Sequence, residues 1–180
     1  MNIYNEFIKA IKSENVDAIK FFLNFKNFNP TYECNYAIRL AAFLGNNQSL
    51  ITLLNDQRID PSDVDNFAVI EAIKQENTET LQILLNDYRI KKEKINNELL
   101  IKLALDSKNL SIIKVLINHE KTNPITKDLI DLIIFDYKSK KNIISILFNN
   151  KIIYDYFKNN HPNHYKTIFK IIIQRKVNEF

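Results

Sequence analysis

Apolar residues recur along this chain at the three- and four-residue spacing of one helix face. In the segment 78–86, for example, Leu81, Leu84 and Leu85 fall on a common face, and the segment 66–75 carries the same period. A three-residue polar break separates these two segments and suits a turn between antiparallel helices. The pattern therefore predicts short helices in pairs.

The helix pairs repeat in a fixed register. Four asparagines, spaced by 31, 31 and 32 residues, mark the copies: Asn15, Asn46, Asn77 and Asn109. An alanine stands five residues before each, where a larger side chain would push the two helices apart: Ala10, Ala41, Ala72 and Ala104. Further markers follow each asparagine: Leu23, Leu54, Leu85 and Ile117, then Pro30, Pro61, Lys92 and Pro124. Each copy predicts helix, turn, helix and extended loop, and copies must stack because one alone cannot bury its apolar face.

A fifth copy is weaker, and the chain end differs from all the copies. The segment 143–148 repeats 112–117, but Phe135 occupies the alanine position, so this copy is expected to pack differently. Pro162 should stand in the first turn of a last helix over 163–177. We expect repeats over 1–155 and a C-terminal helical cap over 156–180. The repeat boundaries are 1–30, 31–61, 62–92, 93–124 and 125–155.

The second copy carries the clearest family signal. Its stretches YAIRLAAFLG (36–45) and LITLLNDQRIDP (50–61) resemble ankyrin repeats. They are especially similar to a divergent subtype that ends in two leucines and Asp-x-Arg-Val-Asp-Pro and is frequent in large DNA viruses and some protists. The resemblance implies an all-α fold, an ankyrin-like solenoid of stacked helix-turn-helix repeats with a C-terminal capping helix.

The copies depart from the ankyrin pattern in two places. The usual Thr-Pro-Leu-His start is missing from every copy, and Tyr36 to Arg39 replace it in the second. Only the second copy keeps a glycine, Gly45, after its first helix. Glu14, Glu76 and Lys108 stand at that position elsewhere, so those turns are expected to be longer or differently shaped.

The resemblance further implies a protein-interaction adaptor that binds an unidentified protein, a host protein if the viral likeness holds. Ankyrin repeats contact partners through loop tips and the concave face of the first helices. Carried over by register, those positions are Tyr32, Glu33, Asn35, Phe43, Leu44, Asp63, Val64, Asn66, Lys74, Gln75, Asn96, Glu98, Asp106 and Ser107.

Two groups at or beside these positions admit alternative interpretations. Phe43 and Leu44 occupy a normally polar position, so they are either exposed anchors for a partner or packing contacts to the neighbouring repeat. Asp60, Asp63 and Asp65 lack the glycine and glutamate of a calcium loop. They form either a solvated loop, which we favour, or a contact for a basic partner.

The sequence favours no catalytic or cofactor chemistry. Gly45 is the only glycine, so phosphate-cradling loops are not expected, and Cys34 is the only cysteine. His161 and His164 lack further ligands for a zinc site. We expect no enzyme activity, small-molecule substrate, cofactor or metal. Without an apparent signal peptide or membrane span, a cytoplasmic monomer is expected, in the host cytoplasm if the protein is viral.

Positive charge gathers at the C-terminal end. Lys158, Lys166, Lys170, Arg175 and Lys176 outweigh Glu179 and account for the chain's net charge of +4. A basic terminal helix could contact nucleic acid or an anionic membrane weakly. A structural cap built on the apolar residues of 168–173 is the favoured interpretation. A degenerate array with only a structural role is the third alternative.

Overall fold

A computed structural model describes residues 3–136 and 140–178 of the chain, with backbone only for Lys141, Ile171 and 174–178. The described residues form α-helices, one short 3₁₀ segment and connecting loops, and contain no strand. The expected all-helical class is therefore confirmed. The chain divides into two units, residues 1–96 and 97–180, which are described separately below.

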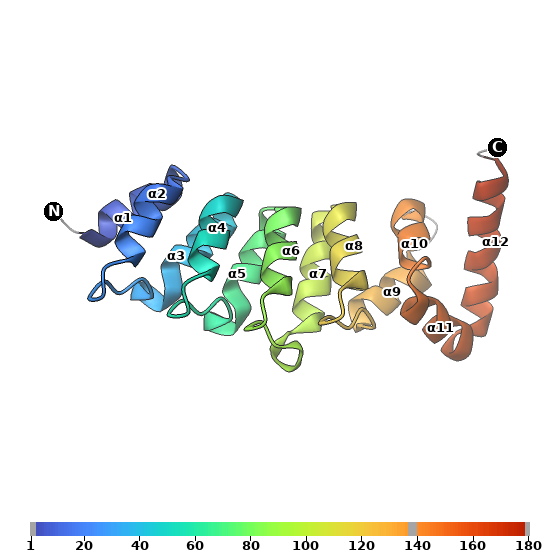
Figure 1. Cartoon of the computed structure of the whole chain (residues 1–180). Helices are drawn as coiled ribbons and strands as arrows, with labels where there is room; N and C mark the ends of the chain where they lie inside the picture. Colours follow the sequence, from blue (N-terminus) through green and yellow to red (C-terminus); the bar gives the residue numbers. More distant parts are fainter. Residues whose placement is uncertain (1–2, 137–139, 179–180) are drawn as a thin grey trace. The chain divides into compact units, whose positions relative to one another are not determined.

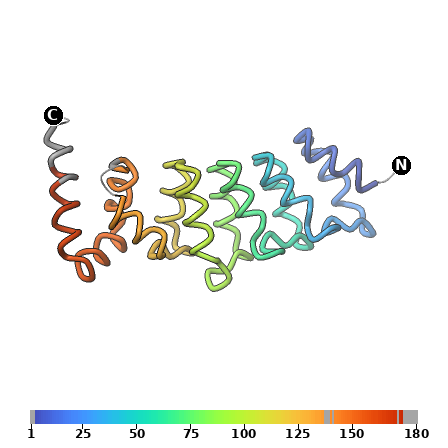
Figure 2. The backbone as a smooth tube through the Cα atoms, turned by 180° about the vertical axis from the view of Figure 1, so that it is seen from behind, coloured from blue at the N-terminus to red at the C-terminus, as the bar shows by residue number. Residues whose placement is uncertain are grey.

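The first unit consists of three successive helix pairs. Its elements are α1 (Ile3–Lys12), α2 (Val16–Leu23), α3 (Tyr32–Leu44), α4 (Asn47–Leu54), α5 (Asp63–Lys74), α6 (Thr78–Asn86) and the 3₁₀ segment η1 (Lys92–Lys94). The first helices α1, α3 and α5 pack side by side in one layer, and the second helices α2, α4 and α6 form the other (Figure 1). The reverse view in Figure 2 shows the same two layers.

The second unit begins with another helix pair and ends with the long last helix. Its elements are α7 (Asn97–Ser107), α8 (Leu110–Asn118), α9 (Lys127–Phe135), α10 (Lys141–Leu147), α11 (Lys151–Asn160) and α12 (Pro162–Asn178). Pro162 opens α12, as its position in the sequence predicts. Phe135 is 80% exposed, so the fifth copy does depart from the alanine pattern.

The repeated asparagines begin the second helix of each pair. Asn15 Oδ1 accepts a hydrogen bond from Ala18 N (3.0 Å) and so caps α2. Asn109 caps α8 in the same way. Asn46 and Asn77 also precede helices, but their amide nitrogens reach the preceding pair, where they donate to Ile11 O (2.8 Å) and Ala42 O (3.0 Å). An asparagine at this position thus begins the second helix of each pair, and Asn46 and Asn77 also join their pair to the one before.

The repeated alanines lie where the helices approach most closely. All four are buried, and Ala41 and Ala72 have no exposed surface. Their carbonyls also close the turn, because Asn46 N donates to Ala41 O (3.1 Å) and Asn77 N to Ala72 O (2.9 Å). These are the outer hydrogen bonds of a helix C-terminal cap in which the residue before the asparagine has positive φ.

The turns between the two helices of each pair differ from what the sequence led us to expect. Glu14, Glu76 and Lys108 have φ of 52°, 58° and 59°, in the same left-handed region as Gly45 at 70°. The expected longer or differently shaped turns are therefore wrong. The closing hydrogen bonds and the packing of the alanine hold the backbone in this conformation even where a Cβ atom makes it unfavourable.

Lys108→Gly is expected to stabilise the second unit by about 1 kcal/mol, because glycine adopts positive φ without steric cost. Lys114, an exposed lysine within α8, provides the matched control. Lys114→Gly should destabilise by about 1 kcal/mol, since glycine disfavours a right-handed helix. Urea unfolding of both variants measures the two effects, and a loss of stability in Lys108→Gly would contradict the explanation.

None of the described helices is both long enough and apolar enough to cross a membrane.

Candidate functional site

The end of α3 exposes apolar side chains in the first unit. Phe43 is 44% exposed and Leu44 41% exposed, at the last two positions of the helix before Gly45. The nearby backbone is held independently of these side chains, because Asn77 Nδ2 donates to Phe43 O (3.2 Å). Both side chains are therefore partly exposed, and the binding experiment below distinguishes the two interpretations.

Phe43 borders a hollow between α3 and α5. The hollow has a volume of about 240 Å³ and is lined by Tyr36, Arg39, Leu40, Phe43, Phe67 and Glu71. Five of these six were absent from the sequence-based set. The repeat register could have identified two of them, because Tyr36 and Phe67 are 31 residues apart and thus occupy the same position in adjacent copies.

Two cations lie over the rings of this hollow. The Arg39 guanidinium carbon is 5.7 Å from the Tyr36 ring centre and 5.6 Å from that of Phe67. Lys74 Nζ lies 5.4 Å from the Phe67 ring centre and 3.3 Å from Glu71 Oε1. Positive charge above aromatic faces is attractive, so the hollow combines apolar walls with a cationic rim.

A left-handed turn at the start of α3 fixes the position of Arg39. Glu33, Cys34 and Asn35 all have φ near 55°, three consecutive left-handed residues without a glycine. Arg39 braces this turn, because its Nη2 donates to Glu33 O (2.7 Å) and its Nε to Cys34 O (3.1 Å). Its guanidinium is thereby held on the hollow side of α3.

Asn35 completes the turn from inside the protein. The side chain is buried, donates from Nδ2 to Asp63 Oδ2 (2.8 Å) and accepts at Oδ1 from Asp60 N (3.0 Å). The expectation that Asn35 is available to a partner is therefore wrong. Its carboxamide is used to join the second copy to the third.

The expectation that Asn66 in the third copy is available to a partner is wrong for the same reason. Val64, Asp65 and Asn66 repeat the left-handed turn, and the Asn66 side chain is buried. Its Nδ2 donates to Lys94 O (3.1 Å), on the loop that contains η1. Asn35 lies in the first turn of α3 and Asn66 in the first turn of α5, and the direction of each side chain depends on the unusual backbone turn.

The remaining sequence-predicted residues of the first unit are accessible to different degrees. Asp63 is half-buried, and the others are exposed: Tyr32, Glu33, Val64, Lys74, Gln75 and Asn96. Only Phe43 and Lys74 of the predicted set lie at the hollow described above.

The second unit carries three residues of the predicted set. Glu98 and Asp106 are exposed, whereas Ser107 is half-buried and donates to Ala104 O (2.8 Å) within its own helix. Glu98 Oε1 accepts from Lys127 N (3.1 Å), so it also supports the following loop.

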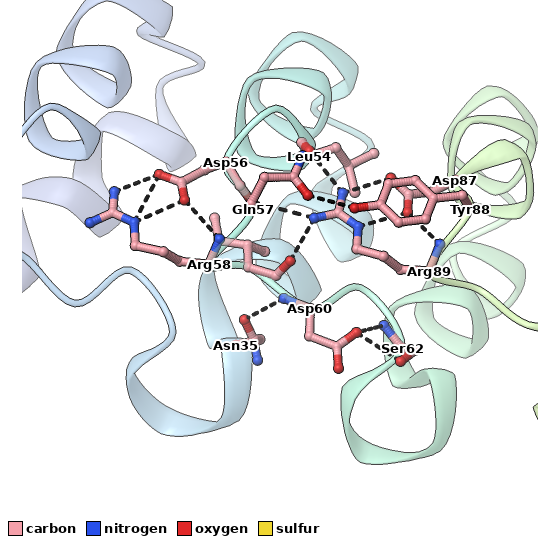
Figure 3. A network of polar contacts seen from close by, with 11 residues as sticks. Asn35, Leu54, Asp56, Gln57, Arg58, Asp60, Ser62, Asp87, Tyr88 and Arg89 are labelled. Carbon is pink, nitrogen blue, oxygen red and sulfur yellow. Dashed lines mark hydrogen bonds and ion pairs between the residues drawn. The ribbon is translucent and has the colours of Figure 1, made fainter.

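The Asp-x-Arg pairs of the second and third copies join neighbouring helix pairs. The Arg89 guanidinium forms two hydrogen bonds with Asp87 and also donates to Leu54 O (2.8 Å) and Ile59 O (2.8 Å) (Figure 3). Leu54 is the last residue of α4, so the cation caps the negative end of that helix.

The second copy uses the same arrangement one pair earlier. Arg58 pairs with Asp56 and donates to Leu23 O (2.7 Å) and Phe28 O (2.9 Å), at the end of α2. The hydrogen bond from Arg58 holds the pKa of the Asp56 carboxyl below its ordinary value. The hydrogen bond with Asp87 likewise raises the pKa of Arg89. These arginines thus join the loop after a second helix to the helix pair before it.

The acidic side chains of Asp60 and Asp63 hold the loop backbone through hydrogen bonds. Asp60 Oδ1 accepts from Ser62 N (2.8 Å) and Ser62 Oγ (2.7 Å), and Asp63 Oδ1 accepts from Val64 N (2.8 Å). Asp65 is exposed. Residues 3–136 and 140–178 contain no group of three or more His, Cys, Asp or Glu side chains placed to hold a metal ion.

The other candidate residues do not line the hollow. Cys34 is a free, exposed thiol on the left-handed turn. The His161 and His164 ring centres are 6.4 Å apart, and His161 packs 5.1 Å from the Phe157 ring centre. Lys158, Lys166 and Lys170 are exposed. The side chains of Arg175 and Lys176, and all of Glu179, lie outside the described residues.

Comparison of the chain with protein-family models, with curated proteins and with solved structures gives no match.

Proposed function

We propose that this chain is a divergent ankyrin-type repeat protein that binds another protein through the first-helix layer around Phe43. Three features support the repeat assignment: the paired helices, the helix-starting asparagines and the buried alanines recur in one register. Stacked helix pairs present extended surfaces that bind partners without catalysis. On this proposal the protein acts as an adaptor and not as an enzyme.

The exposed end of α3 carries the proposal. Phe43 and Leu44 offer apolar surface beside the hollow, and Arg39 and Lys74 add positive charge at its edge. Aromatic and arginine side chains in preorganised hollows contribute most of the binding energy at protein interfaces. The braced left-handed turn holds Arg39 before a partner arrives, which lowers the entropic cost of binding.

The first test is an affinity pull-down from cell lysate with immobilised wild-type chain and the Phe43→Ala/Leu44→Ala variant. A protein retained by the wild type should bind the variant at least 10-fold more weakly, because each truncation removes contact surface worth roughly 1–2 kcal/mol at an interface centre. Titration of the identified protein by calorimetry then gives the change in Kd.

Ile51→Ala is the matched control, because Ile51 is 40% exposed on α4 in the second-helix layer. This variant should retain the partner as the wild type does, and all three chains should melt within a few degrees of each other. Equal retention by the double variant would contradict the assignment of the binding surface. A marked loss of melting temperature with unchanged binding would instead make Phe43 a packing residue.

A further inference from the structure

The arginines of the first unit differ in whether the chain supplies them with a counter-ion. Arg58 and Arg89 each pair with the aspartate two residues before it, as Figure 3 shows. Two residues before Arg39 stands Ala37, and no carboxylate of the described residues forms an ion pair with the Arg39 guanidinium. Arginine keeps its charge at every physiological pH, so Arg39 is a half-buried cation without a counter-ion.

The turn at the start of the first helix can form without an arginine at this position. In the repeat register the residue 31 places after Arg39 is Ile70. The third copy nevertheless forms the same left-handed turn, with φ of 51°, 55° and 62° at Val64, Asp65 and Asn66. The hydrogen bonds from Arg39 to its own turn therefore hold the guanidinium in place, but the repeat does not require this cation.

These hydrogen bonds leave part of the Arg39 guanidinium free. Its Nη2 and Nε each donate to a carbonyl of the turn. The other N–H groups, both on Nη1 and one on Nη2, have no acceptor among the described residues. The rings of Tyr36 and Phe67 attract the cation but do not neutralise it. One end of the guanidinium thus remains available to an anion.

The other charges at the hollow beside Arg39 cancel each other. Lys74 Nζ lies 3.3 Å from Glu71 Oε1, and the remaining side chains that line the hollow are aromatic or aliphatic. One positive charge is left over, next to rings that exclude water, where an ion pair is stronger than on an open surface. The volume of about 240 Å³ is below the roughly 300–1,000 Å³ of small-molecule sites, so the hollow suits a single side chain.

We propose that the partner of this surface is an acidic peptide segment in which Asp or Glu stands beside a large apolar residue. The carboxylate pairs with the free end of Arg39, and the apolar side chain enters the hollow beside Phe43. A carboxylate matches the single unpaired charge, whereas a doubly charged phosphate would face Glu71 with only one free cation. The inference rests on the proposed function, because it names the chemistry of the partner at the same surface.

Selection from a random peptide library displayed on phage, with the whole chain immobilised, tests this chemistry. The selected peptides should carry Asp or Glu beside an aromatic or large aliphatic residue. Replacing that acid by its amide should weaken binding to the wild-type chain at least about 10-fold in fluorescence anisotropy, because a charge-assisted hydrogen bond is lost. Selected peptides that bind without a carboxylate, or a library that yields no binding peptide, would overturn the inference.

Arg39→Ile tests the same pair from the side of the protein. The third copy carries isoleucine at this position, so the variant should fold and should bind the selected peptides at least about 10-fold more weakly. Lys20→Ile is the matched control, because it removes an exposed cation from α2 in the second-helix layer, and it should bind as the wild type does. Undiminished binding by a folded Arg39→Ile, or an equal loss in Lys20→Ile, contradicts the pairing. If Arg39→Ile does not fold, the amide peptides decide on the wild-type chain.

The Phe43→Ala/Leu44→Ala variant separates failure of this inference from failure of the proposed function. Carboxylate-free peptides that the double variant no longer binds would overturn the acidic partner and leave the binding surface at Phe43 in place. Acidic peptides that the double variant binds as tightly as the wild type would contradict the surface itself, and this inference with it.

Discussion

Replacing Arg89 by alanine is expected to lower the free energy of unfolding by about 2–4 kcal/mol, because it removes charge-assisted hydrogen bonds from a buried pair. The side chains of Arg89 and Asp87 are only 12% and 10% exposed. Without the guanidinium, Asp87 loses its counter-ion and three backbone carbonyls lose a donor. Urea unfolding followed by circular dichroism measures the loss as a lower midpoint.

Arg58→Ala is the natural comparison, since Arg58 makes the same kind of contacts from a more exposed position. Its side chain is 37% exposed, so solvent can replace the lost bonds and the expected cost is about 1 kcal/mol. Arg89→Lys should recover little, because an ammonium group cannot pair with Asp87 and reach three carbonyls at once. Equal losses in Arg58→Ala and Arg89→Ala would show that burial does not govern these contacts.

Phe7→Ala should have an effect at least as large, about 3–5 kcal/mol, because it empties a ring-sized space in a close-packed core. Phe7 has no exposed surface, and its ring centre lies 4.9 Å from that of Phe28 and 5.9 Å from that of Phe22. Thermal unfolding followed by circular dichroism measures the loss as a lower melting temperature.

Phe21→Ala is the control for that measurement. Phe21 belongs to the same aromatic cluster but is 59% exposed, so its truncation should change the stability of the single chain by less than about 1 kcal/mol. A large loss for Phe21→Ala would mean that this ring belongs to the core.

The helices and their pairing follow closely from local sequence. The segment 78–86 is the helix α6 with the predicted bounds, and α12 begins at Pro162 as predicted. Both predictions rest on interactions between residues a few positions apart, such as apolar periodicity and the fixed φ of proline. Ala41 and Ala72 are buried as predicted, because only a small side chain fits between paired helices.

The candidate surface was less predictable than the fold. Register alone placed Phe43 and Leu44 on an exposed position, but it also placed Asn35 and Asn66 there, and both are buried. The difference comes from three consecutive residues of positive φ in the first turn of each helix. No local rule predicts such a turn without glycine, since its cost is offset by hydrogen bonds such as those of Arg39 to the turn and of Asn35 to the next copy.

The sequence by itself thus determined the helical class, the repeat register and the residues that begin and separate the helices. Only the tertiary structure decided which of the repeated polar residues join neighbouring copies and which remain at the surface. Arg89 and Lys74 are both long cations in the third copy, but one is fixed among carbonyls 30 or more residues away and the other lies over a ring. Hydrogen bonds across such separations depend on how the copies stack, which periodicity does not specify.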